Sequence, residues 1–297
     1  MDSRLKGYLA GALAAAAYGC NPLFGIPMYH DGMEPLSVLF LRFLGAAAIL
    51  GIVMRWKRMP FHLERNQLVP VMVMGILMLL SSITLFHSYL YMDAGIASSL
   101  LFVYPVMVAV LNVTLFHEKV TSTMVVSLVL ALAGICLLYR PAGTDQTTQG
   151  RFLVGFLLVM GSALSYAIYM IGVNRPSVKQ IPSVTLVFYV LLIGAFLYGI
   201  FLLLKGRMAL PQSPLGWTCA GGIALVPTIV AFFGTAWGIR LAGSTPVAIL
   251  GALEPVTAVF FGILLFGEQL TFRASFGIIL IILAVTLIIL GKKNSHS

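Results

Sequence analysis

The sequence predicts an all-α membrane protein in which ten transmembrane helices form two inverted five-helix repeats. Three observations predict this fold class: an apolar composition, ten apolar stretches of spanning length, and an internal duplication. Of the 297 residues, 60% are hydrophobic and only 9% are charged. A soluble globule needs more polar surface than this composition supplies, so we expect a chain that crosses a membrane many times.

Ten apolar stretches account for most of the chain. A membrane-spanning helix needs about 20 mainly apolar residues. Such stretches occur near residues 6–27, 34–55, 68–92, 95–115, 122–140, 151–172, 183–205, 216–240, 245–266 and 272–291. The connections are too short for a folded extramembrane domain, so we expect the function to lie within or across the bilayer. The first stretch is long enough to span and shows no convincing cleavage site, which argues against a cleavable signal peptide.

Two segments, residues 94–121 and 242–271, share one plan. Each opens with Ala-Gly, carries a central proline, and has a glutamate thirteen residues after that proline and a threonine three positions later. The prolines, Pro105 and Pro255, are 150 residues apart, about half the chain. Residues 7–18 also match residues 155–166, at an offset of 148. We therefore expect a duplicated chain, with one five-helix repeat at 1–143 and a second at 150–292.

The net charge of +9 is distributed unevenly between the two sets of connections. If the connections are numbered alternately from the N-terminus, one side holds twelve Lys and Arg residues and the other holds five. The positive-inside rule then places both termini in the cytoplasm. Because each repeat has an odd number of spans, the halves enter the membrane in opposite directions. We expect a multi-pass protein of the cell (inner or plasma) membrane, with the bilayer and not a nucleic acid as its partner.

Motifs for an enzyme or a metal site are absent from the sequence. Cys20, Cys136 and Cys219 all fall inside predicted spans and far from any CxxC spacing, so neither disulfides nor a metal site is expected. The sequence has no Walker-type GxxxxGK[ST], no HExxH, no GxSxG and no paired carboxylates. We therefore expect no catalytic residues, no metal, no cofactor and no ATP hydrolysis.

Two charged residues lie inside predicted spans. Arg42 is in the second span, where a charge costs about 2.5 to 3.5 kcal/mol on insertion scales. It needs a partner, which is either a salt bridge or carbonyls at a helix break, or else the substrate. Glu254 is the only carboxylate inside a predicted span and lies near its middle, with Tyr104 as its counterpart in the first half. An intramembrane ionisable group predicts a functional site, and a protonated or salt-bridged structural glutamate is the other interpretation.

Polar and aromatic residues near helix breaks supply the other candidates. Tyr18 and Asn21 are three apart, beside a break expected at Pro22 and Pro27, and either line a cavity or form an interhelical hydrogen bond. Tyr166 and Tyr169 share a helical face, as packing residues or as part of a pocket for an organic substrate. The third span brings His87 and Tyr91 to one face, where the histidine either bonds a neighbour or handles protons.

Prolines and caps predict local backbone features. Pro105, Pro227 and Pro255 each free a carbonyl four residues earlier, at Leu101, Ile223 and Gly251, and uncommitted backbone oxygens near midplane are typical of transporter sites. Thr121 and Thr271 resemble N-caps of the fifth and tenth spans. The acids that precede them, Glu118 and Glu268, are interpreted as turn chemistry that favours the positive end of each helix.

A family resemblance rests on these same segments. The chain resembles EamA-type members of the drug/metabolite transporter superfamily in LRFLGA of the second span, the AG turns, LEPVTAVFFGILLFGEQLT of the ninth span and its echo YPVMVAVLNVTLFHEKVT in the fourth. The likeness covers almost the whole chain and departs from the usual pattern at Tyr18, where tryptophan is common, and at His117, where glycine is. It implies ten helices around a central cavity and outward movement of small organic solutes such as amino acids, related metabolites or drugs.

The resemblance leaves the mechanism and the solute open. Inverted repeats with broken midspan helices favour alternating access, coupled to a proton or another ion. A passive channel or a structural membrane protein is the alternative. The expected substrate-binding residues are Tyr18, Asn21, Arg42, His87, Tyr91, Tyr104, Tyr166, Tyr169 and Glu254.

Overall fold

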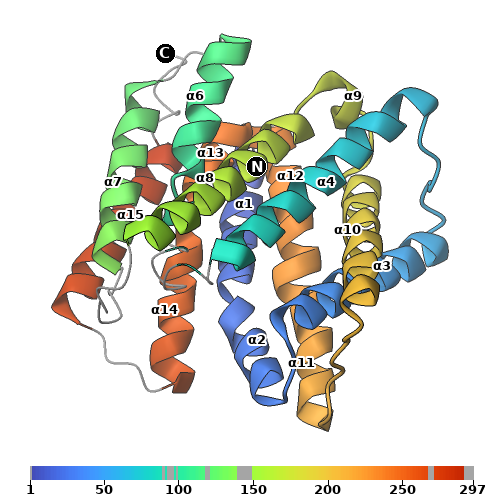
Figure 1. Ribbon diagram of the computed structural model, residues 1–297. Coiled ribbons are helices and arrows are strands. Elements are labelled where there is room, and N and C mark those ends of the chain that lie inside the picture. The colour runs from blue at the N-terminus through green and yellow to red at the C-terminus, as the bar shows by residue number, and fades with distance from the viewer. Residues whose placement is uncertain are drawn as a thin grey trace.

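Every regular element in the computed structural model is helical within the residues it describes, which are 2–88, 91, 97, 100–117, 121–138, 149–266 and 271–290. Figure 1 shows these helices. The first half contains α1 Ser3–Gly19, α2 Asn21–His30, α3 Pro35–Trp56, α4 Arg65–Ser88, α6 Tyr104–Phe116 and α7 Ser122–Leu138. The second contains α8 Gln149–Val173, α9 Pro176–Lys179, α10 Ser183–Lys205, α11 Pro214–Ala224, the π-helix η1 Leu225–Val230, α12 Ala231–Ala242, α13 Ser244–Leu250, α14 Leu253–Phe266 and α15 Phe272–Leu290.

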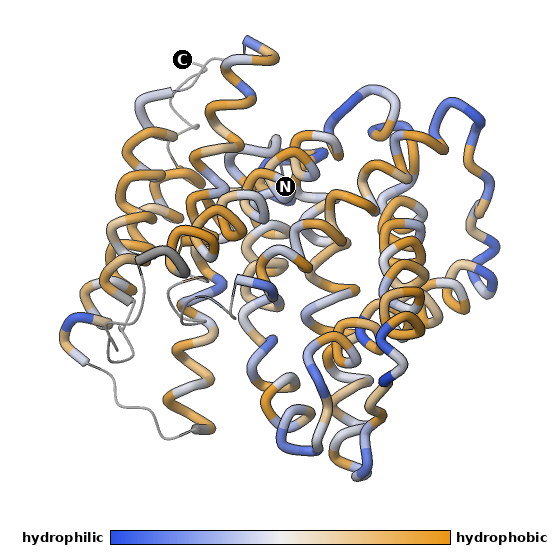
Figure 2. Tube along the Cα trace, in the orientation of Figure 1, coloured by the Kyte–Doolittle hydropathy of each residue, from blue (hydrophilic) through white to orange (hydrophobic). Residues whose placement is uncertain are grey.

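Apolar helices of membrane-spanning length confirm the predicted class. Eight helical segments of the described chain are long and apolar enough to span, and two shorter apolar helices, Tyr104–Phe116 and Ser122–Leu137, lie at the fourth and fifth predicted spans. Figure 2 shows that hydrophobic residues run along the helices, whereas hydrophilic residues gather in the connections and at helix ends. The protein is therefore an all-α, multi-pass membrane protein.

Several spans are broken near their middle, at places where a proline follows. The segment α1–α2 breaks at Cys20, just before Pro22, whereas Pro27 is accommodated inside α2 and does not end it. The segment α13–α14 breaks at residues 251–252, before Pro255, and the chain turns at residues 102–103, before Pro105. Proline removes a helical N–H and clashes with the preceding turn, so breaks at equivalent places in both halves are expected.

One carbonyl at these breaks differs from the prediction. The carbonyl of Gly251 accepts from the backbone N–H of Glu254 at 2.9 Å, so it is not uncommitted. The shorter turn made by these residues satisfies the oxygen that Pro255 leaves without a helical donor.

Small residues let α1 pack closely against the second half. A Cβ on Gly7 would lie 2.8 Å from the Leu241 Cβ, and one on Gly19 would lie 2.5 Å from the Glu254 carbonyl oxygen. A Cβ on Gly238 of α12 would lie 3.0 Å from the carbonyl oxygen of Gly7. The four-residue spacing of small residues in α1 thus forms a close helix interface, as such spacing predicts in membranes. Helix α1 contacts α12, α13 and α14 in this way.

The turns that flank the broken helices follow local rules. Gly243, between α12 and α13, has φ of +94°, which explains the glycine of the Ala-Gly pair. The hydroxyl of Thr121 accepts from the Met124 backbone N–H, and that of Thr271 from the Ala274 N–H, each at 3.3 Å. The predicted N-caps are therefore confirmed. Glu118 and Glu268 lie outside the described residues.

The arrangement places α1 at the centre of the bundle. In Figure 1, α7 and α15 lie side by side at one flank and α3, α4 and α10 at the other, with α1 and α12 between them. Most buried apolar residues form one continuous core. A separate small cluster joins α2 and α11 through residues such as Met28, Cys219 and Ile223, at the end of the bundle away from α6 and α13.

Candidate functional site

Four tyrosines meet in the interior of the bundle. Tyr104 from α6 contacts Tyr166 from α8 edge-to-face, with ring centroids 4.9 Å apart, and Tyr166 stacks on Tyr169 at 6.1 Å. Tyr18 from α1 stacks on Phe232 from α12 at 6.0 Å. A narrow cavity, too tight to hold a water molecule in this conformation, lies between them and is lined by Tyr18, Met78, Tyr166, Tyr169, Phe232 and Thr235. The structure therefore places three of the predicted tyrosines around one cavity.

Tyr104 links this cluster to the helix break of the other half. Its hydroxyl donates to the Ala248 carbonyl at 3.3 Å, in the last turn of α13. The hydroxyl also lies against Gly251, where any side chain would collide with it. Tyr104 begins α6 directly after the turn at residues 102–103. The breaks of the two halves therefore lie against each other, and Tyr104 joins them.

Glu254 lies beside the tyrosines, in the first turn of α14. Its charge acts on the hydroxyls of Tyr18, Tyr104 and Tyr166. The side chain is partly buried and, among the described residues, its carboxylate has no hydrogen-bond or ion-pair partner. An acid is favoured at a helix N-terminus. The structure therefore offers a carboxylate without a hydrogen-bond or ion-pair partner among these residues, although the charge of Arg42 acts on it.

Arg42 is buried and binds neutral groups at two helix breaks. Its Nε donates to the Thr228 hydroxyl at 2.6 Å and its Nη2 to the Pro227 carbonyl at 2.7 Å, both in η1. Its Nη1 donates to the Asn21 side-chain oxygen at 2.9 Å, at the start of α2. The guanidinium also lies 5.1 Å from the centre of the Tyr18 ring. Of the alternatives for Arg42, these contacts fit a guanidinium at a helix break, and its hydrogen bonds do not include Glu254.

The π-helix explains how the break at Pro227 is satisfied. The Thr228 hydroxyl donates to the carbonyl of Ile223 at 2.7 Å, the oxygen that Pro227 leaves without its helical donor. The Pro227 carbonyl in turn accepts a hydrogen bond from Arg42. Asn21 was expected either to line a cavity or to form an interhelical hydrogen bond. Its side-chain oxygen accepts from Arg42 of α3, which is an interhelical hydrogen bond.

Two predicted residues are not brought to this cluster. His87 is exposed, and its Nδ1 lies 3.2 Å from the Ile83 carbonyl of its own helix. Tyr91 is 37% exposed. Neither lines the tyrosine cavity. Helix α4 ends at Ser88 and Tyr91 lies in a turn beyond it, so the two residues do not share the helical face expected from their spacing.

Two further polar residues were not singled out from the sequence. The Asn112 amide donates to the hydroxyls of Ser244 at 2.8 Å and Thr245 at 2.9 Å, and so ties α6 to the start of α13. A buried asparagine inside an apolar span is the signal that could have identified it. In the sequence, Arg240 is one more positive residue at the end of a predicted span. In the structure, its charge acts on the Tyr169 hydroxyl.

A larger hollow lies elsewhere and has a different character. It has a volume of about 270 Å³ between α6 and α7 and is lined by Val106, Ala109, Val110, Val113, Thr114, Met124, Val125, Leu128 and Thr245. Its walls are almost wholly apolar, and Val110 is 52% exposed on the outer surface of the bundle. Acyl chains fit such a surface, which offers few groups to orient a polar solute. Among the described residues, no group of three or more His, Cys, Asp or Glu could hold a metal.

Comparisons with known proteins agree with this architecture. The chain is 29% identical to an uncharacterized transporter of Archaeoglobus fulgidus over 91% of this chain and 92% of that protein. It is 23% identical to an uncharacterized transporter of Clostridium kluyveri over 98% and 95%, and 26% identical to uncharacterized transporter YvbV of Bacillus subtilis over 70% and 69%.

The fold and the family follow from two further comparisons. A solved structure, whose title reads only "Crystal structure of protein", superposes with a TM-score of 0.84 at 16% identity, over 97% of this chain and 99% of that one, and so shares the fold. The EamA-like transporter family matches twice, at residues 5–140 and 153–290. The chain therefore belongs to the EamA-like transporter family.

Proposed function

We propose that the protein is a secondary transporter that exports small organic solutes, such as amino acids, related metabolites or drugs, by alternating access. The observation that supports this most is the junction of the two helix breaks at the tyrosine cavity, where Tyr104 of one half lies on Gly251 of the other. Transporters built from repeats bind their solutes at such interfaces. Aromatic walls with hydroxyls suit an organic solute that carries polar groups.

Glu254 gives the proposed cycle its coupling group. A carboxylate without a protein partner binds either a proton or a cationic part of the solute. Each choice changes the relative stability of the inward-open and outward-open states, because a ligand shifts an equilibrium by its differential affinity for the two states. The coupling partner proposed here is a proton or another ion, alongside the solute.

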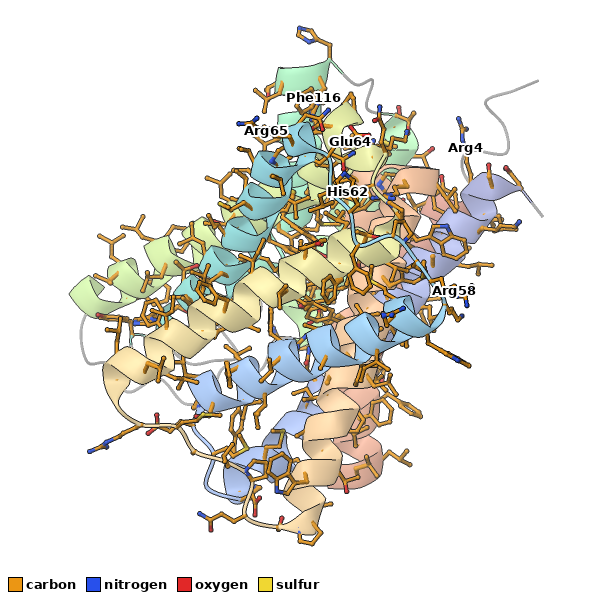
Figure 3. All side chains as sticks on the ribbon, turned by 90° about the vertical axis from the view of Figure 1, so that its right-hand side faces the viewer. Arg4, Arg58, His62, Glu64, Arg65 and Phe116 are labelled. Atoms are coloured by element: carbon orange, nitrogen blue, oxygen red, sulfur yellow. The ribbon has the colours of Figure 1, made fainter. Side chains whose placement is uncertain are left out.

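The orientation is proposed from charge. Figure 3 shows the labelled Arg4, at the start of α1, and Arg65, at the start of α4, in the upper half of the bundle, and Arg58, in the connection from α3 to α4, at about its mid-height. Positive residues favour the cytoplasmic side. We place this end, and both chain termini, in the cytoplasm of a cell-membrane protein.

Metabolite export and counterflow test the function. Cells with and without the protein are compared for solutes that accumulate inside or appear outside, and the best solute is then measured in proteoliposomes. A carrier gives saturable flux that is stimulated by unlabelled solute on the opposite side. The alternative, a passive channel or a structural membrane protein, gives linear flux without counterflow or no flux at all.

A further inference from the structure

Buried polar atoms without partners gather where α8 and α12 end. Within the part of the chain that the structure describes, Tyr169 Oη, Asn174 Oδ1 and Arg240 Nε are buried and have no hydrogen-bond partner. Tyr169 lies in the last turns of α8 and Asn174 directly follows that helix, while Arg240 lies two residues before the end of α12. Helices α8 and α12 are in contact. Because buried polar atoms are normally paired, such a group indicates a missing ligand or solvent partner.

Arg240 makes few contacts for a guanidinium with five N–H donors. One of its terminal nitrogens donates to the Val178 carbonyl at a long 3.3 Å. No carboxylate among the described residues pairs with it. Its charge acts on the Tyr169 hydroxyl, which is part of a side chain only 2% exposed. Two donors without a partner among the described residues, Arg240 Nε and the Tyr169 phenol, therefore lie on two helices that are in contact and that both end on the side we place in the cytoplasm.

Tyr169 also lines the tyrosine cavity, together with Tyr18 and Thr235. We propose that Arg240 and Tyr169 form an anion subsite at one end of this cavity, which binds a carboxylate or similar oxyanion group of the transported solute. The guanidinium fork matches the two oxygens of such a group, and the phenol O–H adds a third donor. The inference rests on the proposed transport function and adds a chemical class to its solute.

The position of Glu254 is consistent with this assignment. Glu254 acts on Tyr18, Tyr104 and Tyr166, whereas Arg240 acts on Tyr169. Glu254 and Arg240 therefore act on different members of the tyrosine cluster, although a second basic group, Arg42, acts on Tyr18 together with Glu254. An anionic group at Arg240 is accordingly not forced against the Glu254 carboxylate.

Phenyl-bearing probes that carry a carboxylate, an ammonium group or both on a similar short chain test the subsite. Purified protein in phosphatidylcholine vesicles is assayed with labelled 3-phenylpropionate, phenylalanine and phenethylamine, and thermal stabilisation by each probe is measured in detergent. The first two carry a carboxylate and the third does not. We expect Arg240→Gln to weaken the apparent affinity for the two carboxylates by roughly tenfold or more and to leave phenethylamine unchanged.

Further variants separate binding from folding. Arg240→Lys is expected to recover part of the affinity, since it keeps the charge without the fork. Tyr169→Phe is expected to weaken carboxylate binding severalfold without lowering thermal stability, because the hydroxyl has no partner to lose. Lys179→Gln removes an exposed positive charge from the neighbouring helix α9 and is the control that leaves all three probes unchanged.

Three results would overturn the subsite. The first is an equal effect of Arg240→Gln on acids and amine, or no effect on either, which would make Arg240 a structural residue. The second is an effect that occurs only when anionic phosphatidylglycerol is added, which would identify a lipid headgroup as the ligand. The third is a wild-type protein that does not bind the two carboxylates but shows counterflow of a solute without an anionic group. This result would exclude the anion subsite and would still support the transport function. Failure of every solute in the export screen counts instead against the transport function, and thermal stabilisation by 3-phenylpropionate still decides the subsite.

Discussion

Two charged side chains inside spans are accommodated in different ways. Arg42 is 7% exposed and donates to three neutral oxygens, two of which belong to η1. The Glu254 carboxylate has no hydrogen-bond donor among the described residues, and its charge acts on the hydroxyls of Tyr18, Tyr104 and Tyr166. A buried charge whose nitrogens are all hydrogen-bonded within the protein supports structure, whereas a carboxylate without a donor is available to a ligand. At this scale we expect Arg42 to govern stability and Glu254 to govern transport.

The first prediction concerns Glu254. Glu254→Gln keeps the size and most of the hydrogen bonding of the side chain while it removes the charge. We expect a folded, membrane-inserted protein whose initial transport rate is much reduced or no longer depends on pH. Initial rates are measured against pH in proteoliposomes, with Glu34→Gln as a control that removes an exposed carboxylate. Matching curves for wild type and Glu254→Gln would show that Glu254 serves only the helix N-terminus.

The second prediction concerns Arg42. Arg42→Ala leaves the Pro227 carbonyl and the Asn21 oxygen without their donor, and unsatisfied buried groups cost about 1 to 3 kcal/mol each. We expect a clear fall in thermal stability in detergent and only partial recovery in Arg42→Lys, which cannot donate in three directions from a planar fork. Arg55→Ala, which removes an exposed arginine at the other end of α3, is the control. Equal stability of both alanine variants would contradict the structural role.

At the scale of elements, the close approach of α1 to the second half fixes the position of the broken helices. Gly19 allows the last turn of α1 to lie on the backbone of α14 at Glu254 and Ala258. The segment α2 then leaves this interface at Cys20 and packs with α11 in its own apolar cluster. A displacement of α1 from α14 would therefore move the Glu254 carboxylate relative to the tyrosines.

The third prediction tests this interface. A Cβ at Gly19 would lie 2.5 Å from the Glu254 carbonyl oxygen and 2.6 Å from the Thr257 Cβ, so Gly19→Ala forces the helices apart. Overpacking of this kind costs about 1 to 3 kcal/mol. We expect lower thermal stability and slower transport. Gly25→Ala in α2 is the matched control, since a Cβ there meets nothing within 4 Å. A Gly19→Ala variant as stable and active as Gly25→Ala would exclude a close-packed interface.

The fourth prediction concerns the connection that precedes α11. Backbone N–H groups of Ser213 and Gln212 donate to the Asp31 carboxylate at 3.0 and 2.8 Å and hold the pKa of that carboxyl below its ordinary value. A depressed folded pKa stabilises the protein above the unfolded pKa, about 3.9, and this contribution is lost as pH falls through the folded pKa. We expect Asp31→Asn to melt at a lower temperature than wild type near pH 7, with the gap closing below about pH 4. A gap that stays constant with pH would contradict the role of the charge.

At the scale of the whole molecule, two halves enclose one polar interior. Residues of both halves meet at the end that we place in the cytoplasm, through Asn112 with Ser244 and through Arg175, whose guanidinium lies over the Phe116 ring at 2.8 Å. Figure 3 shows Phe116 at this same upper end. A rearrangement that opens the cavity to the cytoplasm would have to separate these pairs.

The fifth prediction is topological. Both termini are expected in the cytoplasm, with the connection near residues 143–150 outside, most of which lies beyond the described residues. After replacement of Cys20, Cys136 and Cys219, a single cysteine at position 146 should react with an impermeant reagent added from outside. A cysteine at position 2 should react only after the membrane is opened. Labelling of position 146 from the cytoplasm alone would exclude the inverted arrangement of the two halves.

The sequence by itself determined the features that depend on near neighbours along the chain. Composition and length predicted the apolar spans, Pro105 and Pro255 predicted breaks at equivalent places, and Thr121 and Thr271 predicted caps. Each of these effects acts within about one helical turn, because proline, caps and hydrophobic length change local hydrogen bonding or local burial. The tyrosines and Glu254 were identifiable for the same reason, as polar groups in apolar stretches.

Only the tertiary structure decided which of those groups meet. Arg42 finds Thr228 across 186 residues, Tyr104 reaches the Ala248 carbonyl across 144, and His87 does not join them. Arg240 resembled an ordinary positive residue at a span end until its burial and its proximity to Tyr169 were known. Contacts of this kind depend on how closely packed helices are rotated and staggered, which local hydrophobic patterns constrain only weakly in a bilayer, since lipid is as apolar as the helix faces.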